Sequence, residues 1–221
     1  MSSTSAAERT EEKFYPDGAA KRRLTQAERT AISDQRMFHS AMELILERGA
    51  NRATLREICE NAGYSRGLAN SRFGSKDNFL HELLKHFNHV WTDHLANCTA
   101  NHRGLDAVLS AIDALARFMA EQERFMRGGY IIWYEHITGD NPVRAQLALN
   151  HQRYRSDMVR WLEQGIEDGT IRPDVDADGF AVFYLSWVSG TVYQWLVAPQ
   201  AIDLSNAFNF IKEVAQRELT L

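Results

Sequence analysis

The chain has few of the residues that stabilise small or turn-rich folds: its 221 residues include two cysteines, four prolines and 13 glycines. Cys59 and Cys98 cannot form a disulfide framework or a four-ligand zinc site, so we expect a reduced, cytoplasmic protein. The low proline and glycine content argues against a turn-dense all-β fold. Residues 1–13 are polar, and the absence of an apolar core in them argues against a secretory signal.

Charge is also missing from one long stretch of the chain, residues 179–202. Such a length is sufficient for a membrane span. Polar residues and a proline interrupt it, however, at Ser186, Ser189, Gly190, Thr191, Gln194 and Pro199. We therefore predict a helix that is buried on nearly all sides, as at a subunit interface, and no membrane partner.

The charge that is present is unevenly distributed. The composition, with 44% hydrophobic and 24% charged residues, is that of a chain that buries a real core. Residues 21–76 contain eleven Lys and Arg against six Asp and Glu, whereas the whole chain has a formal net charge of −4. A basic segment on an acidic body is compatible with one end approaching a polyanion.

Helix signals recur along the chain without a convincing strand pair. Gly49 is a helix C-cap, Thr54-Leu55-Arg56-Glu57 is a capping box, and Ser65 offers a further N-cap. We predict an all-α protein of about nine helices. Their expected positions are 25–48, a short helix from Thr54 to before Gly63, a short helix from Ser65 to Gly74, a long helix from Lys76, and helices from Gly104, at 124–138, at 142–168, after Asp176 or Asp178, and at 204–219.

These helices are expected to form two domains after a flexible arm. The polar residues 1–24 form the arm, because they offer little apolar surface to offset the entropy of ordering. Residues 25–76 form a small basic domain, and residues 77–221 form a larger helical body. In the small domain, two short helices joined by a glycine-containing turn match a helix-turn-helix, whose second helix enters the major groove of DNA.

The stretch 64–73, Tyr-Ser-Arg-Gly-Leu-Ala-Asn-Ser-Arg-Phe, has the residue types that such a helix needs. Small residues allow a close approach to base edges, and arginine supplies paired donors for guanine or phosphate. Cys59, at a small apolar position of the preceding helix, is interpreted as core packing.

The order of motifs from Met37 to Leu84 resembles the N-terminal domain of the TetR family of transcriptional repressors. The matching pieces are Ala41-x-Glu43-Leu44-Ile45-x-Glu47-Arg48-Gly49, Thr54-x-Arg56-x-Ile58-x-x-x-Ala62-Gly63, Ser65-Arg66-Gly67 and Phe73-Gly74-Ser75-Lys76. A later segment, residues 163–174, also looks like a turn that is common in the ligand-binding bodies of that family.

The resemblance implies a DNA-binding role for the matching residues. Thr54 and Lys76 are expected to hold phosphates, whereas Arg56, Arg66 and Asn70 are candidates to reach bases. Family members usually carry an aromatic residue at the position of Asn70 or Ser71, where it packs on the DNA backbone. Its absence here indicates a different contact with the DNA at this position. The full predicted set is Thr54, Arg56, Ser65, Arg66, Gly67, Asn70, Ser71, Arg72 and Lys76.

Specific binding by such a domain requires a dimer, because one DNA-binding domain reads about half a turn of DNA. The two domains of a dimer must lie about 34 Å apart. The uncharged helix and the last helix supply an apolar stripe for this contact. The predicted interface consists of Ala181, Leu185, Val188, Gly190, Val192, Trp195, Phe208 and Ile211.

The resemblance further implies a small-molecule effector that binds in the body and favours the form unable to span both half-sites of an operator. Large aromatic residues of the body are the candidates for the pocket: Trp91, Phe118, Trp133, Tyr134, Tyr154 and Trp187. The predicted function is therefore a ligand-responsive repressor that binds a palindromic operator in double-stranded DNA as a homodimer.

Other functions have weaker support in the sequence. The spacing of His86, His89 and Asp93 fits a divalent metal, but no second ligand pair or cysteine grouping accompanies it, so we predict no metal and no cofactor. No GxSxG, glycine-rich phosphate loop, HExxH or paired cysteines are present, and we predict no enzymatic activity. A protein-binding adaptor and a small helical enzyme that uses a cavity in the body remain the alternatives.

Overall fold

Helices follow one another along the whole described part of the chain. The computed structural model describes residues 24–220, and in this range it contains nine helices and no strand, which confirms the predicted all-α fold. The predicted arm lies outside the described residues except for Leu24. The helices are α2 (Gln26–Arg48), α3 (Leu55–Asn61), α4 (Leu68–Phe73), α5 (Lys76–Thr99), α6 (Gly104–Glu121), α7 (Glu123–Glu135), α8 (Pro142–Glu167), α9 (Ala177–Val197) and α10 (Leu204–Leu219).

Side-chain caps explain most of the helix starts. The capping box before α3 is present: the Thr54 hydroxyl accepts a hydrogen bond from the backbone N–H of Glu57, whose carboxylate accepts one from the N–H of Thr54. At the start of α5 the Ser75 hydroxyl accepts from the N–H of Asn78, and at the start of α9 Asp176 Oδ1 accepts from the N–H of Gly179. Each cap satisfies backbone donors that have no partner inside the helix.

The chain divides into two units, Met1–Arg36 and Met37–Leu221. The described part of the first unit is residues 24–36, which include the beginning of α2. Thr25 opens this helix, because its N–H and hydroxyl both donate to the Glu28 carboxylate, at 2.7 and 3.0 Å.

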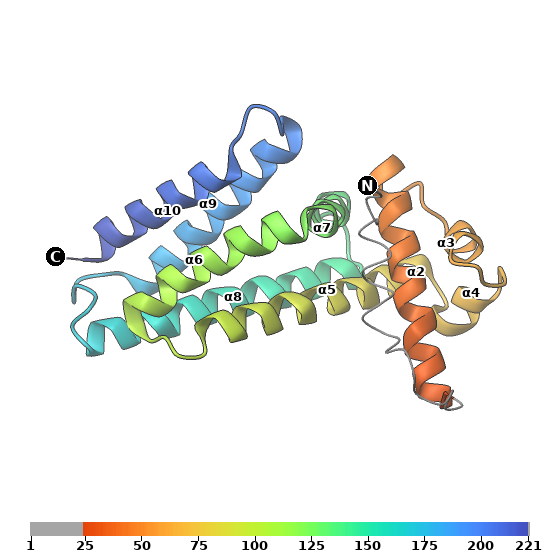
Figure 1. Cartoon of the computed structure of the whole chain (residues 1–221), viewed down its shortest axis with the longest axis horizontal. Coiled ribbons are helices and arrows are strands. Elements are labelled where there is room, and N and C mark those ends of the chain that lie inside the picture. The colour runs from red at the N-terminus through yellow and green to blue at the C-terminus, as the bar shows by residue number, and fades with distance from the viewer. Residues whose placement is uncertain (1–23, 221) are drawn as a thin grey trace, which may run out of the picture. The chain divides into compact units, whose positions relative to one another are not determined.

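The second unit has two hydrophobic cores. The smaller core joins the end of α2 to α3, α4 and the first half of α5, around Met37, Ile45, Ile58 and Phe79, which are almost completely buried. It also contains residues from much later in the chain, Ile132 of α7 together with Val143 and Leu147 of α8. The larger core lies among α5, α6, α8, α9 and α10, where α6 runs beside α8 and α10 pairs with α9 (Figure 1).

The uncharged stretch forms α9, which ends at Val197. None of the described helices combines the length and the apolar character of a membrane span. One side of this helix is buried in the larger core, where Ala181, Val188 and Val192 are almost completely covered.

Candidate functional site

The turn between α3 and α4 is fixed by contacts beneath it. Cys59 of α3 is fully buried, and its sulfur accepts a hydrogen bond from the N–H of Ala69 in α4 at 3.3 Å. The hydroxyl of Ser40 in α2 donates to the carbonyl of Ile58 at 2.9 Å. Because buried polar contacts of this kind require one geometry, α4 is held in a defined orientation on α3.

The outer face of this pair of helices carries several of the predicted DNA-binding residues. Arg56, Arg66, Asn70 and Ser71 are all exposed. Glu60, which the sequence analysis did not single out, makes ion pairs with both arginines: Arg56 Nε lies 3.2 Å from its carboxylate, and Arg66 Nε is also in direct contact. The two arginines therefore lie close together and are held beside α3 when no DNA is present.

Ser65 does not start α4 as expected. The helix begins at Leu68, its N-cap position is Gly67, and no side chain caps it. The carbonyl of Ser65 instead accepts from the N–H of Leu68 at 3.0 Å, which makes a turn before the helix. Ser65 and Gly67 are exposed on this turn, and Arg72 lies half-buried on α4.

Thr54 and Lys76, the predicted phosphate contacts, already have partners within the chain. The Thr54 hydroxyl donates to Glu57 Oε2 at 2.6 Å, and this hydrogen bond is the largest cause of the lowered pKa of Glu57. Lys76 Nζ donates to the backbone carbonyls of Ala50 and Asn51, at 3.1 and 2.9 Å. Lys76 therefore ties the start of α5 to the turn between α2 and α3.

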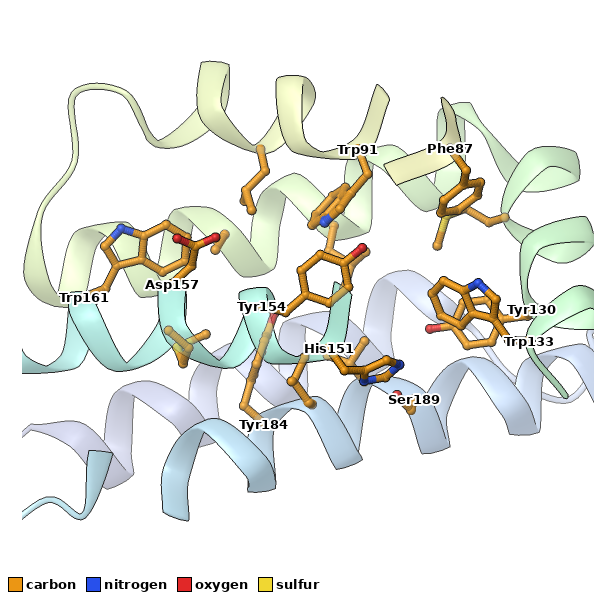
Figure 2. Close-up of a pocket in the computed structure, with 17 residues that line it drawn as sticks. Phe87, Trp91, Tyr130, Trp133, His151, Tyr154, Asp157, Trp161, Tyr184 and Ser189 are labelled. Carbon is orange, nitrogen blue, oxygen red and sulfur yellow. The ribbon is translucent and has the colours of Figure 1, made fainter. Parts of the chain in front are cut away.

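A cavity of about 80 Å³ lies within the larger core of the second unit (Figure 2). The helices α5, α6, α7, α8 and α9 supply its walls, which are mostly aromatic and aliphatic. Three of the predicted effector residues, Trp91, Trp133 and Tyr154, are among the lining residues.

The other three predicted effector residues do not line the cavity. Phe118 is buried behind Trp91, with ring centroids 5.3 Å apart. Tyr134 is 41% exposed and packs edge-on against Tyr193. Trp187 packs against Phe183 at 4.2 Å. Aromatic content alone did not indicate which way each ring points.

The sequence analysis missed several polar residues of the lining, among them Tyr130, His151, Tyr184 and Ser189. Tyr130 precedes Trp133 by three residues on a helix, a spacing that places both on one face and was available as a signal. Burial raises the pKa of Tyr130, Tyr154 and Tyr184, so all three hydroxyls stay protonated at neutral pH. Burial also lowers the pKa of His151 and favours its neutral form.

Helix α7 contacts the helix-turn-helix through both of its ends. Arg124 Nη2 donates to both carboxylate oxygens of Glu43 in α2, at 2.8 and 2.7 Å. Glu135 Oε2 accepts from the backbone N–H of Asn51 at 2.6 Å, in the turn between α2 and α3. Gly49 has a φ of +86° in this turn, and a Cβ there would lie 2.6 Å from Glu135 Oε1. The fit of Glu135 against the turn thus depends on glycine.

The predicted dimer residues are mostly covered by their own chain. Leu185 lines the cavity, and a Cβ added at Gly190 would meet no neighbouring atom within 4 Å. The buried members are Ala181, Val188, Val192, Trp195, Phe208 and Ile211. Packing of α9 against α8 and α10 determines which side of this apolar helix faces inward.

The opposite side of α9 exposes large apolar residues. Val182, Phe183, Tyr193 and Val197 lie on it, and Phe210 of α10 is also exposed. Spacings of three and four residues along α9 place these side chains, Ser186 and Gly190 along one face. This group, which we call the α9 outer face, is an exposed apolar patch of the kind that marks interaction sites.

The histidines of α5 point to separate partners. His86 stacks on Phe38, and burial lowers its pKa, with a smaller contribution from His89. His89 lies 3.4 Å from Asp93, and His94 Nε2 lies 3.0 Å from the carbonyl of Ala114. Within residues 24–220 no group of three or more metal-ligating side chains is found.

The buried core of α2–α4, the exposed arginines on its outer face and the cavity in the helical body define a helix-turn-helix transcriptional regulator. Residues 38–83 match the family model described as bacterial regulatory proteins, tetR family. The HTH-type transcriptional regulator TtgR of Pseudomonas putida is 25% identical over 173 residues, which cover 76% of this chain and 82% of that protein. The HTH-type transcriptional repressor KstR2 of Mycobacterium tuberculosis is 29% identical over 168 residues, 72% of this chain and 80% of that protein.

Solved structures agree on the fold. The SmeT–triclosan complex superposes with a TM-score of 0.74 at 18% identity, over 86% of this chain and 92% of that one. A transcriptional regulator from Saccharomonospora viridis in complex with choline also gives 0.74, at 16% identity, over 86% of this chain and 99% of that one. Residues 38–83 thus form a DNA-binding domain of the TetR family of regulators, which confirms the resemblance seen in the sequence.

Proposed function

We propose that this regulator is a repressor that binds a palindromic operator as a homodimer and leaves it when a small molecule occupies the cavity. The observation that carries the proposal is the double contact of α7. Trp133 of this helix lines the cavity, and Glu135, two residues later, holds the turn between α2 and α3. Two residues along a helix are separated by about 200° of rotation. One side of α7 therefore faces the cavity, and the opposite side faces the turn between α2 and α3.

The DNA contact is proposed to involve the outer face of α3 and α4. Arg56 and Arg66 exchange Glu60 for base edges or phosphates, and the exposed amide of Asn70 is suited to reading adenine. Lys76 keeps one ammonium proton beyond its two hydrogen bonds to carbonyls, which is available to a phosphate. The proposed set is Thr54, Arg56, Ser65, Arg66, Gly67, Asn70, Ser71, Arg72 and Lys76.

The proposed dimer forms through the α9 outer face, with Phe210 of α10 beside it. Its support is the exposure of Phe183, Tyr193, Val197 and Phe210, which are 44%, 51%, 67% and 63% accessible. Burial of such side chains against a second copy removes apolar surface from water. The open space around Gly190 permits a close approach of two helices.

Release from DNA is proposed to begin at the cavity. The neighbours solved with choline and with triclosan carry small ligands, which supports the same use of the cavity here. An effector that needs more room than about 80 Å³ binds better to a form with displaced walls, and this differential affinity shifts the equilibrium. Displacement of Trp133 moves α7 and, with it, Glu135 and the turn at Asn51.

Selection from a pool of random DNA duplexes tests the proposed function directly. We expect the full-length chain to enrich an inverted repeat, because two identical DNA-binding domains related by a two-fold axis read two identical half-sites. Binding of the enriched duplex should weaken roughly a thousandfold between 50 and 200 mM salt if about six phosphates are contacted. Anisotropy titrations measure this loss. A pool that shows no enrichment, or an affinity that is insensitive to salt, favours the alternative function of a protein-binding adaptor.

Replacement of Glu135 by alanine should weaken binding of the enriched duplex by about three- to tenfold. The substitution removes the acceptor of the Asn51 N–H and loosens the turn that precedes α3. Faster amide hydrogen exchange at residues 49–54 should accompany the loss. Glu135→Gln keeps a side-chain oxygen as acceptor and should restore most of the affinity.

Glu123→Ala is the matched control, because Glu123 lies on the same helix and pairs with Arg127 of that helix, at 3.5 Å. It should leave both the affinity and the exchange rates unchanged. Equal effects of Glu123→Ala and Glu135→Ala would show that α7 acts through its general stability and not through the contact with the turn.

A further inference from the structure

Two polar hydrogen-bond donors in the wall of the cavity lack partners. Tyr184 is 6% exposed and lines the cavity, and its hydroxyl makes no hydrogen bond to any residue between 24 and 220. Figure 2 shows its side chain reaching from α9 toward Tyr154. The indole Nε1 of Trp133 is buried and also unpaired within the described chain. Buried donors normally have partners, so an unpaired donor in a cavity wall indicates a ligand atom that accepts.

Tyr154 of the same cavity already has a partner and provides a contrast. Its hydroxyl donates to Asn88 Oδ1 at 2.7 Å. The need for an acceptor is thus a property of Tyr184 and Trp133, and not of every tyrosine in the wall.

The charges around the cavity argue against an ionic ligand. Of the lining residues, all of which are described, Asp157 alone is acidic, and Arg160 already pairs with it at 2.8 Å. No lysine or arginine is among these lining residues, so an anion has no counter-charge. Burial lowers the pKa of His151 and nearby Arg155 lowers it further, which favours the neutral form of this side chain. An anion would therefore lose its hydration without a partner of opposite charge, and a cation would have to compete with Arg160 for Asp157.

The volume and the apolar walls of the cavity indicate the size and shape of the ligand. Trp91, Trp133 and Trp161 present flat apolar faces to the cavity. Its volume of about 80 Å³ is smaller than the ~150 Å³ of an engineered cavity that binds benzene, so a ring compound must push the walls outward. Met126 and Met158 are flexible side chains in these walls and can adapt.

We propose that the effector is an uncharged compound of one or two rings that accepts a hydrogen bond from Tyr184, with Trp133 as a second donor. This inference rests on the proposed function, because it names the chemical class of the effector that the cavity takes. A ketone or ether oxygen on a planar hydrocarbon ring system meets the requirement.

Four compounds on one bicyclic skeleton test the proposal: 1-indanone, indane, 1-aminoindane as its ammonium form, and indane-1-carboxylate. Binding to the full-length chain is measured by titration calorimetry and by quenching of tryptophan fluorescence. We expect 1-indanone to bind about three- to tenfold more tightly than indane, as one neutral hydrogen bond allows, and both ionic compounds to bind more weakly than indanone.

Tyr184→Phe removes the unpaired hydroxyl and keeps the ring. It should lower the affinity for 1-indanone to that for indane, whose own affinity stays unchanged. Tyr154→Phe is the control, because it removes a hydroxyl of the same cavity that already donates to Asn88, and it should retain the preference for indanone. Melting curves of both variants establish that each is folded.

Tighter binding of the ammonium compound or of the carboxylate overturns the proposal, and so does an unchanged preference for indanone in Tyr184→Phe. Absence of indanone binding at its solubility limit also overturns it. Failure of the proposed function is distinguishable, since the duplex selection contains no ligand: a chain that enriches no DNA contradicts the regulator, whatever its cavity binds.

Discussion

Replacement of Arg66 by alanine should weaken binding of the selected operator by at least about 30-fold while leaving the fold intact. An arginine that contacts a guanine contributes about 1–3 kcal/mol, and a dimer loses this contribution twice. The cost to stability is small, because the side chain is 68% exposed and its ion pair with Glu60 lies on the surface. Anisotropy titration gives the affinity, and thermal melting checks the fold.

Arg217→Ala is the matched control for this experiment. Arg217 is a similarly exposed arginine beside a carboxylate, Glu218, and it lies on α10, outside the helix-turn-helix. Its removal subtracts the same charge from the chain without touching the proposed DNA contact, so the affinity should change by less than about twofold. Equal losses in both variants would mean that only net charge matters, and unchanged binding of Arg66→Ala would remove α4 from the DNA contact.

Helix positions were largely predictable because the signals for them are local. The capping box at Thr54 and the last helix, 204–219, were found where the sequence placed them. Ser65 was a wrong N-cap, because the backbone closes a turn from Ser65 to Leu68 before the helix begins. A residue type favoured at caps indicates where a helix can start, but the path of the neighbouring chain decides where it does.

Side-chain direction was much less predictable than helix position. On α9 every side is apolar, so Ala181 and Val182 look alike in sequence, although the first is buried and the second exposed. The contact between Glu135 and Asn51 joins residues 84 positions apart, and no local pattern encodes it. The cavity presents the same difficulty: Trp91 faces it and Trp187 does not, since the packing of five helices decides which rings meet.

Gly190→Arg should convert the proposed dimer into a monomer and lower operator affinity by more than about a hundredfold. Gly190 lies within the α9 outer face, and a Cβ added there would meet no neighbouring atom within 4 Å. Arginine has a higher helix propensity than glycine by roughly 0.7 kcal/mol, so the helix itself should not suffer. The new charge would instead be buried against a second copy without a partner.

Mass measurement by light scattering across a concentration series detects the loss of the dimer. Operator affinity should fall as well, because two separate DNA-binding domains lose the effective concentration that a dimer provides. Leu149→Arg is the control: Leu149 is an exposed apolar residue of α8, 59% accessible, and lies outside the α9 outer face. It introduces the same charge and should leave mass and affinity unchanged. A dimer that persists in Gly190→Arg would place the interface away from the α9 outer face.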